Sequence, residues 1–402
     1  MPEAEAANQY LWVSVEDSGN NNFYGGQVLE IVVTDPAINR LDEAYGMPDV
    51  TIDGKKVIMA QGVDGSWYAY IADGAKATGI DSNFNEVENG KGADFGVFCG
   101  PTTEIHFAPG SNTVPVLTAS ESRGIAIPHQ VGVGDSKISS YSQGTGVTTS
   151  CTLGVNAAGQ TAGVATGVNS TTEQINNVVR EPRALSNVTT SQFYGNIALS
   201  PAFWPMIQLY DFTDDQVVDI DYNKGSGMER VQLIYIDNTL GLSLDKERYG
   251  LGHEVGITVH DWNLNIDPTD EDSWTFETNP DNASAFYQLF DENGANDSEQ
   301  TAGAIRNDAN QMSGTWGIPG IVTIDRNGAE DAAANVTNFR TNADVSSNMV
   351  CNPASAPHNT CSTANIPVYN AAMTMVETGA NTGHFVNWDD AMETNVTIAL
   401  DA

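Results

Sequence analysis

Apolar and polar residues alternate with a period of two along much of the chain. The stretches are separated by Gly, Asn and Asp residues, and they lie at 11–17 (LWVSVED), 27–35 (QVLEIVVTD), 66–73 (SWYAYIAD), 217–222 (VVDIDY), 230–237 (RVQLIYID), 253–261 (HEVGITVHD) and 395–401 (NVTIALD). Such alternation predicts strands with one buried and one wet face. Sustained helical periodicity is nearly absent, and DAMETN or TTEQINNVV predict a turn or two at most. We therefore expect an all-β protein.

One strand pattern occurs twice. Residues 26–39 (GQVLEIVVTDPAIN) align with residues 252–265 (GHEVGITVHDWNLN) in the frame Ile-x-Val-x-Asp-x-x-Ile/Leu-Asn. The last strand predicted in each half also recurs, as VQLIYID at 231–237 and VTIALD at 396–401. These matches predict two copies of one unit, with a boundary near residue 238.

Each copy is longer than a plain immunoglobulin-like sandwich of about 100 residues. The excess lies in polar, Gly-rich segments at about 109–175 and about 292–365. The expected architecture is therefore all-β, with tandem immunoglobulin-like β-sandwich domains at 1–238 and 239–402. Each domain carries one of these segments as a long loop insertion.

The net charge limits the partners. The chain has 402 residues, and its 52 Asp and Glu against 16 Lys and Arg give a formal charge of −36. Nucleic acid is excluded as a partner, because binding phosphate requires clustered Lys and Arg. The same field concentrates cations around the molecule. The 13 Phe, 13 Tyr and 7 Trp argue against a disordered acidic tail.

Cysteines and glycosylation sequons point to an extracellular protein. Sequence proximity favours disulfides Cys99–Cys151 and Cys351–Cys361; four free thiols in a cytosolic protein are the alternative. Six Asn-x-Ser/Thr sequons could carry N-linked glycans, at Asn169, Asn187, Asn282, Asn296, Asn335 and Asn395. No stretch approaches the length of a membrane span and no signal segment opens the chain, so any anchor is expected outside these residues.

No motif for catalysis stands out. The sequence contains neither a G-x-S-x-G elbow nor a P-loop, and its six histidines are dispersed, with His253 and His260 expected on opposite faces of one strand. Among 52 acids some pair always suits glycoside cleavage, so their abundance favours no hydrolase. We expect a protein that is not an enzyme.

Residues 261–272 are the best candidate for a metal site. The predicted strand ends at an aspartate and is followed by an acidic loop, whose candidate Ca²⁺ ligands are Asp261, Asn265, Asp267, Asp270, Glu271 and Asp272. Ca²⁺ prefers six to eight oxygen ligands of this kind. The alternative is an ordinary turn in which Asp and Asn cap backbone groups. Copy one has a thinner version, in which Arg40 opposes a cation near Asp35, Asn39 and Asp42.

Several longer segments resemble one family. The segments YGMPDVTIDGKKVIMAQGVDGSWYAYIAD, GADFGVFC, NNVVREPRAL, FWPMIQLYDF, VVDIDYNKGSG, NIDPTDEDSWTF and VETGANTGHFVNWDD, in this order, are similar to surface-layer (S-layer) proteins of ammonia-oxidising archaea, the Nitrosopumilus-like Thaumarchaeota. The similarity covers most of the chain. Such proteins are usually far longer, so this chain resembles a segment or a shorter relative.

The resemblance implies a secreted glycoprotein of tandem immunoglobulin-like domains that self-assembles into a two-dimensional lattice at the cell surface. That lattice is an exoskeleton and an acidic sieve that attracts cations and passes ammonium, and its assembly is cation-dependent. The alternative function is a secreted adhesin or a glycan- or protein-binding module of the cell envelope. An extracellular hydrolase is the third hypothesis.

Overall fold

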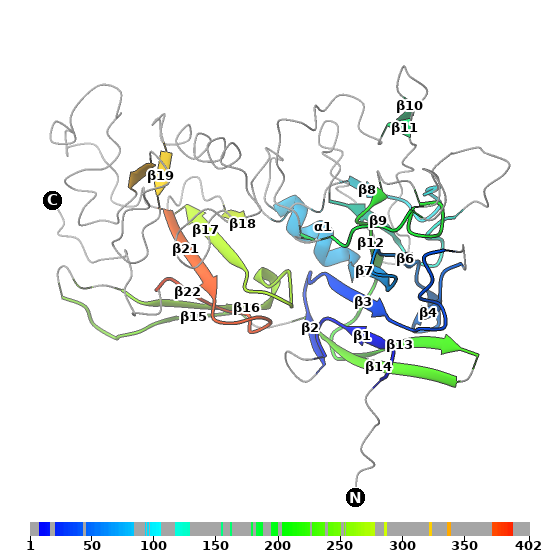
Figure 1. The fold of residues 1–402 in the computed structure, drawn as a ribbon. Helices are drawn as coiled ribbons and strands as arrows, with labels where there is room; N and C mark the ends of the chain where they lie inside the picture. Colours follow the sequence, from blue (N-terminus) through cyan, green and yellow to red (C-terminus); the bar gives the residue numbers. More distant parts are fainter. Residues whose placement is uncertain are drawn as a thin grey trace, which may run out of the picture.

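The protein is rich in β-sheet throughout its described residues (Figure 1). The computed structural model describes residues 8–16, 21–42, 46–83, 93, 95, 97–105, 117–128, 154–155, 161–162, 178–179, 182–187, 194–199, 203–225, 227–237, 240–250, 253, 255–277, 285–287, 321–323, 336–338 and 372–388. The prediction of a β-rich chain is confirmed within these residues. The predicted strand at 395–401 lies outside them.

Two sheets from the first half of the chain form a sandwich. The first has the order β1 (Leu11–Val13), β3 (Leu29–Val33), β7 (Trp67–Asp73), β12 (Ile207–Tyr210), β9 (Gly124–Ile127) and β8 (Val97–Cys99), and β6 (Ala60–Gln61) also pairs with β7. The second has the order β2 (Asn22–Tyr24), β14 (Gly227–Ile236), β13 (Gln216–Lys224), β4 (Asp49–Ile52) and β5 (Lys55–Lys56). Buried side chains of both sheets share one core, as expected for sheets packed face to face.

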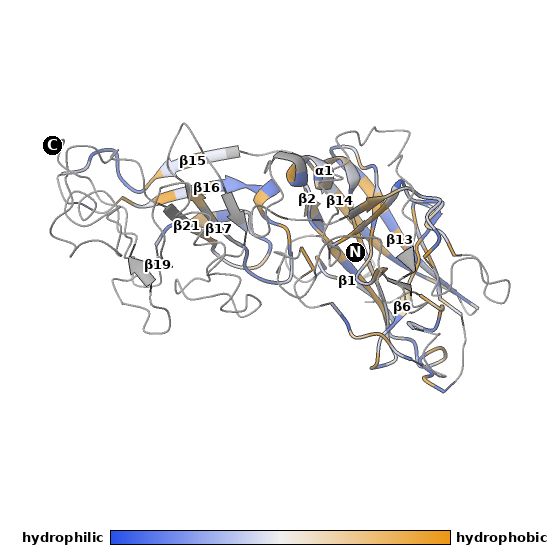
Figure 2. Ribbon diagram, turned by 90° about the horizontal axis from the view of Figure 1, so that it is seen from above, coloured by the Kyte–Doolittle hydropathy of each residue, from blue (hydrophilic) through white to orange (hydrophobic). Residues whose placement is uncertain are grey.

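Period-two alternation explains which side chains fill this core. Along β13 and β14, Val218, Ile220, Val231 and Leu233 point inward and are at most 2% exposed, whereas their sequence neighbours are half-buried or exposed. Figure 2 shows hydrophobic residues in the strands of this sandwich. β7 differs because it is buried on both faces. Its Tyr70 belongs to a second core on the far side of the first sheet.

A third sheet comes entirely from the second half of the chain. Its order is β15 (Leu240–Leu244), β16 (Ile257–Asp261), β22 (His384–Val386), β21 (Ala372–Glu377), β17 (Ser273–Glu277) and β18 (Ala285–Tyr287). Two short pairs complete the described strands: β10 (Gly154–Val155) with β11 (Thr161–Ala162), and β19 (Ile321–Thr323) with β20 (Val336–Asn338). None of these described sheets mixes strands from both sides of residue 238, although the domain boundary stays a prediction.

The second core joins the two halves. Tyr70 of β7 and Ile80 of helix α1 (Gly74–Asn83) share it with Ile266, Trp274 and Phe385 from the third-sheet half. Sequence analysis does not predict α1, because its short GAKATGIDSN sequence has little helical periodicity. No helix of the described residues is long and apolar enough to cross a membrane.

Asp73 fixes the start of α1. Its carboxylate accepts hydrogen bonds from the backbone N–H groups of Lys76 (2.8 Å) and Phe212 (2.9 Å). The first bond caps the helix, and the second ties the helix start to the residue that follows β12 by two positions. Burial raises the pKa of Asp73 to about 6, against the opposing effect of these two hydrogen bonds.

We predict that Asp73→Ala lowers the free energy of unfolding by about 1–3 kcal/mol, because it leaves the buried N–H of Phe212 and the half-buried N–H of Lys76 without their acceptor. Urea denaturation measures this change. Asp42→Ala is the control, since the Asp42 side chain is 69% exposed and pairs with exposed Arg40, and it should change stability by less than about 0.5 kcal/mol. Equal effects of the two substitutions would contradict the capping role.

Candidate functional site

The acidic loop at 261–272 divides into buried and exposed carboxylates. Asn265 and Asp272 are 0% exposed, whereas Asp270 and Glu271 face solvent. The carboxylate of Asp272 accepts hydrogen bonds from the backbone N–H groups of Ile266 and Asp267, the latter at 3.1 Å. It also accepts the hydroxyl of Tyr287 at 2.7 Å. Asp272 therefore folds the loop back on itself.

Glu377, at the end of β21, holds the turn that leads to β22. Its Oε1 accepts the N–H groups of Thr382 (2.6 Å) and Gly383 (2.7 Å) and the side-chain amide of Asn265 (2.9 Å). Its Oε2 accepts the N–H of Asp272 at 3.3 Å. One buried carboxyl group thus ties the acidic loop to the β21–β22 turn.

We call Asn265, Asp272, Glu377 and Asn381 the carboxylate hub. All four are at most 5% exposed. The Asn265 amide also donates to Asn381 Oδ1 at 3.3 Å, while its own Oδ1 is buried and has no hydrogen-bond partner among the described residues. Sequence analysis includes Asn265 and Asp272 in the loop but misses Glu377 and Asn381, which lie more than 100 residues further along the chain.

The hub lies where the two halves of the chain meet. Gln27, which is 1% exposed, donates from Nε2 to Asn381 Oδ1 at 2.7 Å. The other end of the Gln27 amide accepts the N–H of Tyr24 at 2.8 Å. Next to it, the N–H of Val28 donates to the carbonyl oxygen of Ile266 at 2.8 Å. Buried polar groups thereby connect the start of β3 to the hub.

The electrostatics of the hub favour one proton on its carboxyl groups. Burial, followed by the nearby negative charge of Asp272, raises the pKa of Glu377 to about 8. The N–H groups of Gly383, Thr382 and Asp272 oppose this rise. Two carboxylates buried together repel each other, so a proton on one of them lowers the energy of the pair. Glu377 is therefore mostly protonated at neutral pH.

A stack of rings lies beside the hub. Tyr24 of β2 stacks on Trp262 of the short 3-10 helix η2 (Trp262–Leu264), with ring centroids 3.5 Å apart and planes 7° apart. His260 meets Trp262 edge-on and stacks on His384 at 4.0 Å. Gly383 has φ +62°, and a Cβ there would lie 2.6 Å from the Trp262 ring. Only glycine fits this turn without displacing the tryptophan.

The histidine partners differ from the sequence expectation. β16 begins at Ile257, so His253 lies outside the strand that contains His260. The partner of His260 is His384, directly opposite it on β22. Burial, followed by the charge of His384, lowers the pKa of His260. This pairing could not be predicted from chain spacing, because β16 and β22 are separated by more than 100 residues.

Asp261, Asp267 and Asp270, three other predicted Ca²⁺ ligands, accept hydrogen bonds within their own turns. Asp261 accepts the N–H of Asn263 at 2.9 Å, and Asp267 accepts the N–H and hydroxyl of Thr269 at 2.9 and 2.6 Å. Asp270 accepts the N–H of Glu271 at 2.9 Å. Throughout the described part of the chain, no three or more His, Cys, Asp or Glu side chains are grouped so as to hold a metal ion. The calcium site stays a prediction.

Asp35, Asn39 and Asp42 of copy one correspond to the acidic loop of copy two, and their contacts show the role of the repeated aspartate. Asp35 accepts the N–H of Ala37 at 2.8 Å, as Asp261 accepts the N–H two residues after it. Asp35 is buried and also accepts the hydroxyl of Tyr222 at 2.8 Å. Asn39 donates its N–H to the carbonyl of Asp35, and Asp42 pairs with Arg40 at 2.9 Å. The repeated aspartate therefore caps the turn after its strand.

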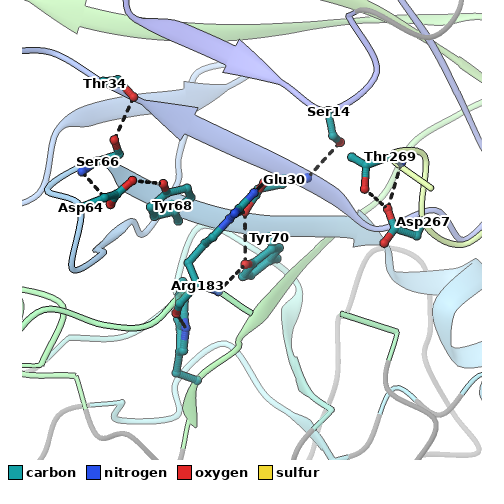
Figure 3. Close-up of polar contacts among 11 residues, drawn as sticks. Ser14, Glu30, Thr34, Asp64, Ser66, Tyr68, Tyr70, Arg183, Asp267 and Thr269 are labelled. Atoms are coloured by element: carbon teal, nitrogen blue, oxygen red, sulfur yellow. Dashed lines mark hydrogen bonds and ion pairs between the residues drawn. The ribbon is translucent and has the colours of Figure 1, made fainter. Parts of the chain in front are cut away.

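A second polar cluster lies on the first sheet, on the face opposite the second sheet (Figure 3). Glu30, 8% exposed, pairs with Arg183 through bonds of 2.9 and 3.1 Å and accepts the Tyr70 hydroxyl at 3.3 Å. Arg183 also lies over the Tyr68 ring, 5.5 Å from its centroid. This cluster attaches residues 182–187 to β3 and β7. Sequence analysis misses it because Glu30 and Arg183 are 153 residues apart.

Most of the predicted covalent sites lie outside the described residues. Cys99 is disulfide-bonded. Cys151, Cys351 and Cys361 are not among the described residues, so both pairings stay predictions. Of the six sequons, only Asn187 is described, and it is exposed. The sequons at Asn169, Asn282, Asn296, Asn335 and Asn395 lie outside the described part.

We predict that Glu377→Gln flattens the dependence of stability on pH. The folded-state pKa of about 8 exceeds the ordinary 4.5, so Glu377 makes the folded protein less stable as pH rises from about 4.5 to about 8. Glutamine has no proton to lose. Between pH 5 and pH 8 the native chain should lose about 3 kcal/mol more stability than the variant.

Urea denaturation at several pH values measures this difference. Glu271→Gln is the matched control, because it removes an exposed carboxylate from the same loop and should leave the slope unchanged. A Glu377→Gln variant with the native slope would show that Glu377 is ionised in the folded protein.

We predict an energetic coupling of about 0.5–1.5 kcal/mol between Tyr24 and Trp262, because their rings stack across the two halves. A double-mutant cycle of Tyr24→Ala and Trp262→Ala measures it from unfolding free energies. The control cycle combines Tyr24→Ala with Trp204→Ala, since Trp204 contacts the ring of Tyr70 instead. Strict additivity in the Tyr24–Trp262 cycle would show that the stack contributes nothing.

Comparisons with known proteins give no assignment for the chain. No protein-family model matches it, and no curated protein matches it. The carboxylate hub, the ring stack and the Glu30–Arg183 cluster are therefore interpreted from their geometry and their chemistry.

Proposed function

We propose that the chain is a structural subunit of an archaeal cell-surface S-layer, in which copies of the chain assemble into a two-dimensional lattice. A load-bearing subunit needs joints that do not bend freely. The observation that supports this role is the buried junction, in which the carboxylate hub and the Tyr24–Trp262 stack connect the two halves. Domains of one chain move relative to each other by default unless their interface is large and hydrophobic, and the second core adds apolar contacts from both halves to this junction.

We further propose tandem immunoglobulin-like domains. Support for the first domain comes from the two sheets of the first half of the chain, which share one core. Support for the second comes from the order β15–β16–β22, which parallels β1–β3–β7 with the same antiparallel pairing. A strand repeated with the same neighbours is what two copies of one sandwich predict.

The charge gives the proposed lattice its second role, as a sieve that attracts cations. The formal charge is −36, and carboxylates such as Asp214, Asp215, Asp270 and Glu271 face solvent. Such a surface raises the concentration of cations, ammonium among them, within about 10 Å at 0.1 M salt. It repels anions to the same extent. The proposed location is extracellular and the proposed role is not enzymatic.

In this proposal Ca²⁺ is bound by exposed carboxylates. Asp272 and Asn265 are occupied inside the hub, whereas Asp270 and Glu271 of the same loop are exposed and Asp261 and Asp267 are half-buried. In a lattice, carboxylates of two neighbouring copies can share one Ca²⁺ and complete its oxygen shell. Calcium would then assist assembly without a closed site in one copy.

We predict that the purified chain forms a periodic sheet when Ca²⁺ is added, and that EGTA disperses it. Negative-stain electron microscopy detects the order. The triple variant Asp267→Asn, Asp270→Asn, Glu271→Gln should need at least about tenfold more Ca²⁺, whereas Asp214→Asn with Asp215→Asn is the control for charge alone.

Two results would contradict the proposal. Monomers across all ionic conditions would exclude self-assembly of this chain. Binding to a glycan array without self-assembly would identify an adhesin or a glycan-binding module instead.

A further inference from the structure

Strand β15 forms one border of the third sheet, because β16 is the only described strand that pairs with it (Figure 1). Asp245, directly after β15, donates its N–H to the carbonyl oxygen of Gly256 at 2.9 Å. In an antiparallel pair every second residue bonds to the partner strand, so the backbone groups of Leu242 and Leu244 point away from β16. Neither of these two N–H groups donates to an acceptor among the described residues. The border of the sheet is therefore open for hydrogen bonding.

The side chains of the same two residues are also exposed. Leu242 is 73% exposed and Leu244 is 53% exposed. Their partners in the register, Val259 and Ile257, pack against the second core. The two leucines therefore extend the core-facing side of the sheet to its border. Apolar surface and unpaired backbone groups occur here together, and the addition of one more strand would remove both from water.

β1, the border strand of the first sheet, has its outward N–H groups capped. The repeat places β1 at the position of β15, because both strands pair with the repeated strand. The N–H of Leu11 donates to the Glu229 carboxylate at 3.0 Å, and the N–H of Val13 donates to the Glu16 carboxylate at 2.8 Å. Both side chains are at most 3% exposed. The corresponding border in copy one is therefore closed to a further strand.

β5, a border strand of the second sheet, is closed in another way. It consists of the exposed residues Lys55 and Lys56, and lysines on a border strand oppose the addition of another strand. The N–H of Lys56 donates to the Glu121 carboxylate at 2.5 Å, and its carbonyl oxygen accepts the Tyr210 hydroxyl at 3.3 Å. By contrast, the β15 sequence LGLSL contains no charged residue and no proline. β15 therefore lacks the features that close β1 and β5.

We propose that β15 is a contact between two copies of the chain, in which the two β15 strands pair antiparallel around a twofold axis perpendicular to the sheet. An antiparallel border is self-complementary under such an axis. Each copy then supplies acceptors for the outward N–H groups of Leu242 and Leu244 in the other copy. The leucines of both copies lie on the same face and pack together, so that the two third sheets become one sheet.

The distribution of charge favours this border as the contact. The formal charge of −36 makes two copies repel each other over most of their surface. β15 itself is uncharged, and the segment that follows it, DKER at 245–248, contains two acids and two bases. Pairing through β15 therefore brings together two segments without net charge.

The contact is small, which makes it reversible. Pairing of five residues buries less than the about 1,200 Å² that stable complexes need, so the dimer should form only at high concentration. In a lattice, several such weak contacts per copy act together. The inference rests on the proposed function to this extent: it identifies one contact between lattice neighbours.

Sedimentation velocity of the full chain tests the pairing. EGTA removes Ca²⁺, and about 0.5 M NaCl screens the net charge. We expect monomers at about 1 µM and dimers at about 100 µM. Leu242→Pro removes only an outward N–H, which a border strand tolerates, and should raise the dissociation constant of the dimer at least about tenfold. Far-UV circular dichroism checks that the variant is folded. Monomers of the native chain at every concentration would overturn the proposal.

Lysine substitutions test the side chains in the same way. Leu242→Lys should also raise the dissociation constant at least about tenfold, because it places a charge in the contact. Val217→Lys is the matched control, since Val217 is 55% exposed but lies on β13 of the second sheet, and it should leave the dissociation constant unchanged. Equal effects of the two lysines would place the contact elsewhere and overturn the proposal.

Hydrogen exchange at the two concentrations locates the contact without any substitution. The amides of Leu242 and Leu244 should exchange at least about tenfold more slowly at about 100 µM than at about 1 µM. The Ser243 amide is the control, because it faces Thr258 of β16 within the chain and should not depend on concentration. Protection of Leu242 and Leu244 already at about 1 µM would show that the same chain pairs with β15, and would overturn the proposal.

The contact and the proposed function can fail separately. A chain that forms a Ca²⁺-dependent periodic sheet but no dimers through β15 would keep the lattice role and overturn this contact. Dimers through β15 without a periodic sheet in Ca²⁺ would support the contact and contradict the lattice role.

Discussion

The arrangement of the second half depends on a single buried carboxyl group. Glu377 accepts hydrogen bonds from the β21–β22 turn and from the acidic loop at the same time. Without Glu377 these N–H groups would lose this acceptor, and an unpaired N–H that is buried costs about 1–3 kcal/mol. Because Asp272 lies close by, the group is most stable with a proton. The hub therefore combines a carboxyl group that favours its protonated form, Glu377, with the charged carboxylate of Asp272.

The hub also sets how the two halves meet. Gln27 reaches into it from the start of β3, and the N–H of Val28 bonds to the loop that the hub shapes. Tyr24 stacks on Trp262 beside these contacts. All three residues come from one short segment, 24–28, so a small part of the first half makes these polar and ring contacts. The shared second core adds apolar contacts around them.

The sequence predicts the features of the fold that are caused by residues close together in the chain. Alternation predicts β3, β13, β14 and β16, because the face that each side chain takes follows from its parity. It also predicts the strand β7, but not that β7 is buried on both faces. The repeated aspartate is likewise local, since Asp35 and Asp261 cap the turns directly after their strands. Helix α1 is missed because burial against β7 stabilises it more than its own weakly helical sequence does.

The contacts missed by sequence analysis all connect distant segments. Glu377 with Asn265, His260 with His384, and Glu30 with Arg183 are each more than 100 residues apart. No pattern in one sequence shows that such residues meet. The acidic loop illustrates the difference: its composition suggests a cation site, whereas the fold uses its most buried carboxylate, Asp272, to bind backbone N–H groups.

The proposed lattice subunit requires that the two halves move as one body, and hydrogen exchange tests this most directly. If the hub joins them, the amides of Val28, Ile266, Thr382 and Gly383 exchange only through global unfolding, with the same protection as Val231 in the sandwich core. Exchange of these four amides within seconds, while Val231 stays protected, would show that the junction opens by itself and would contradict the account.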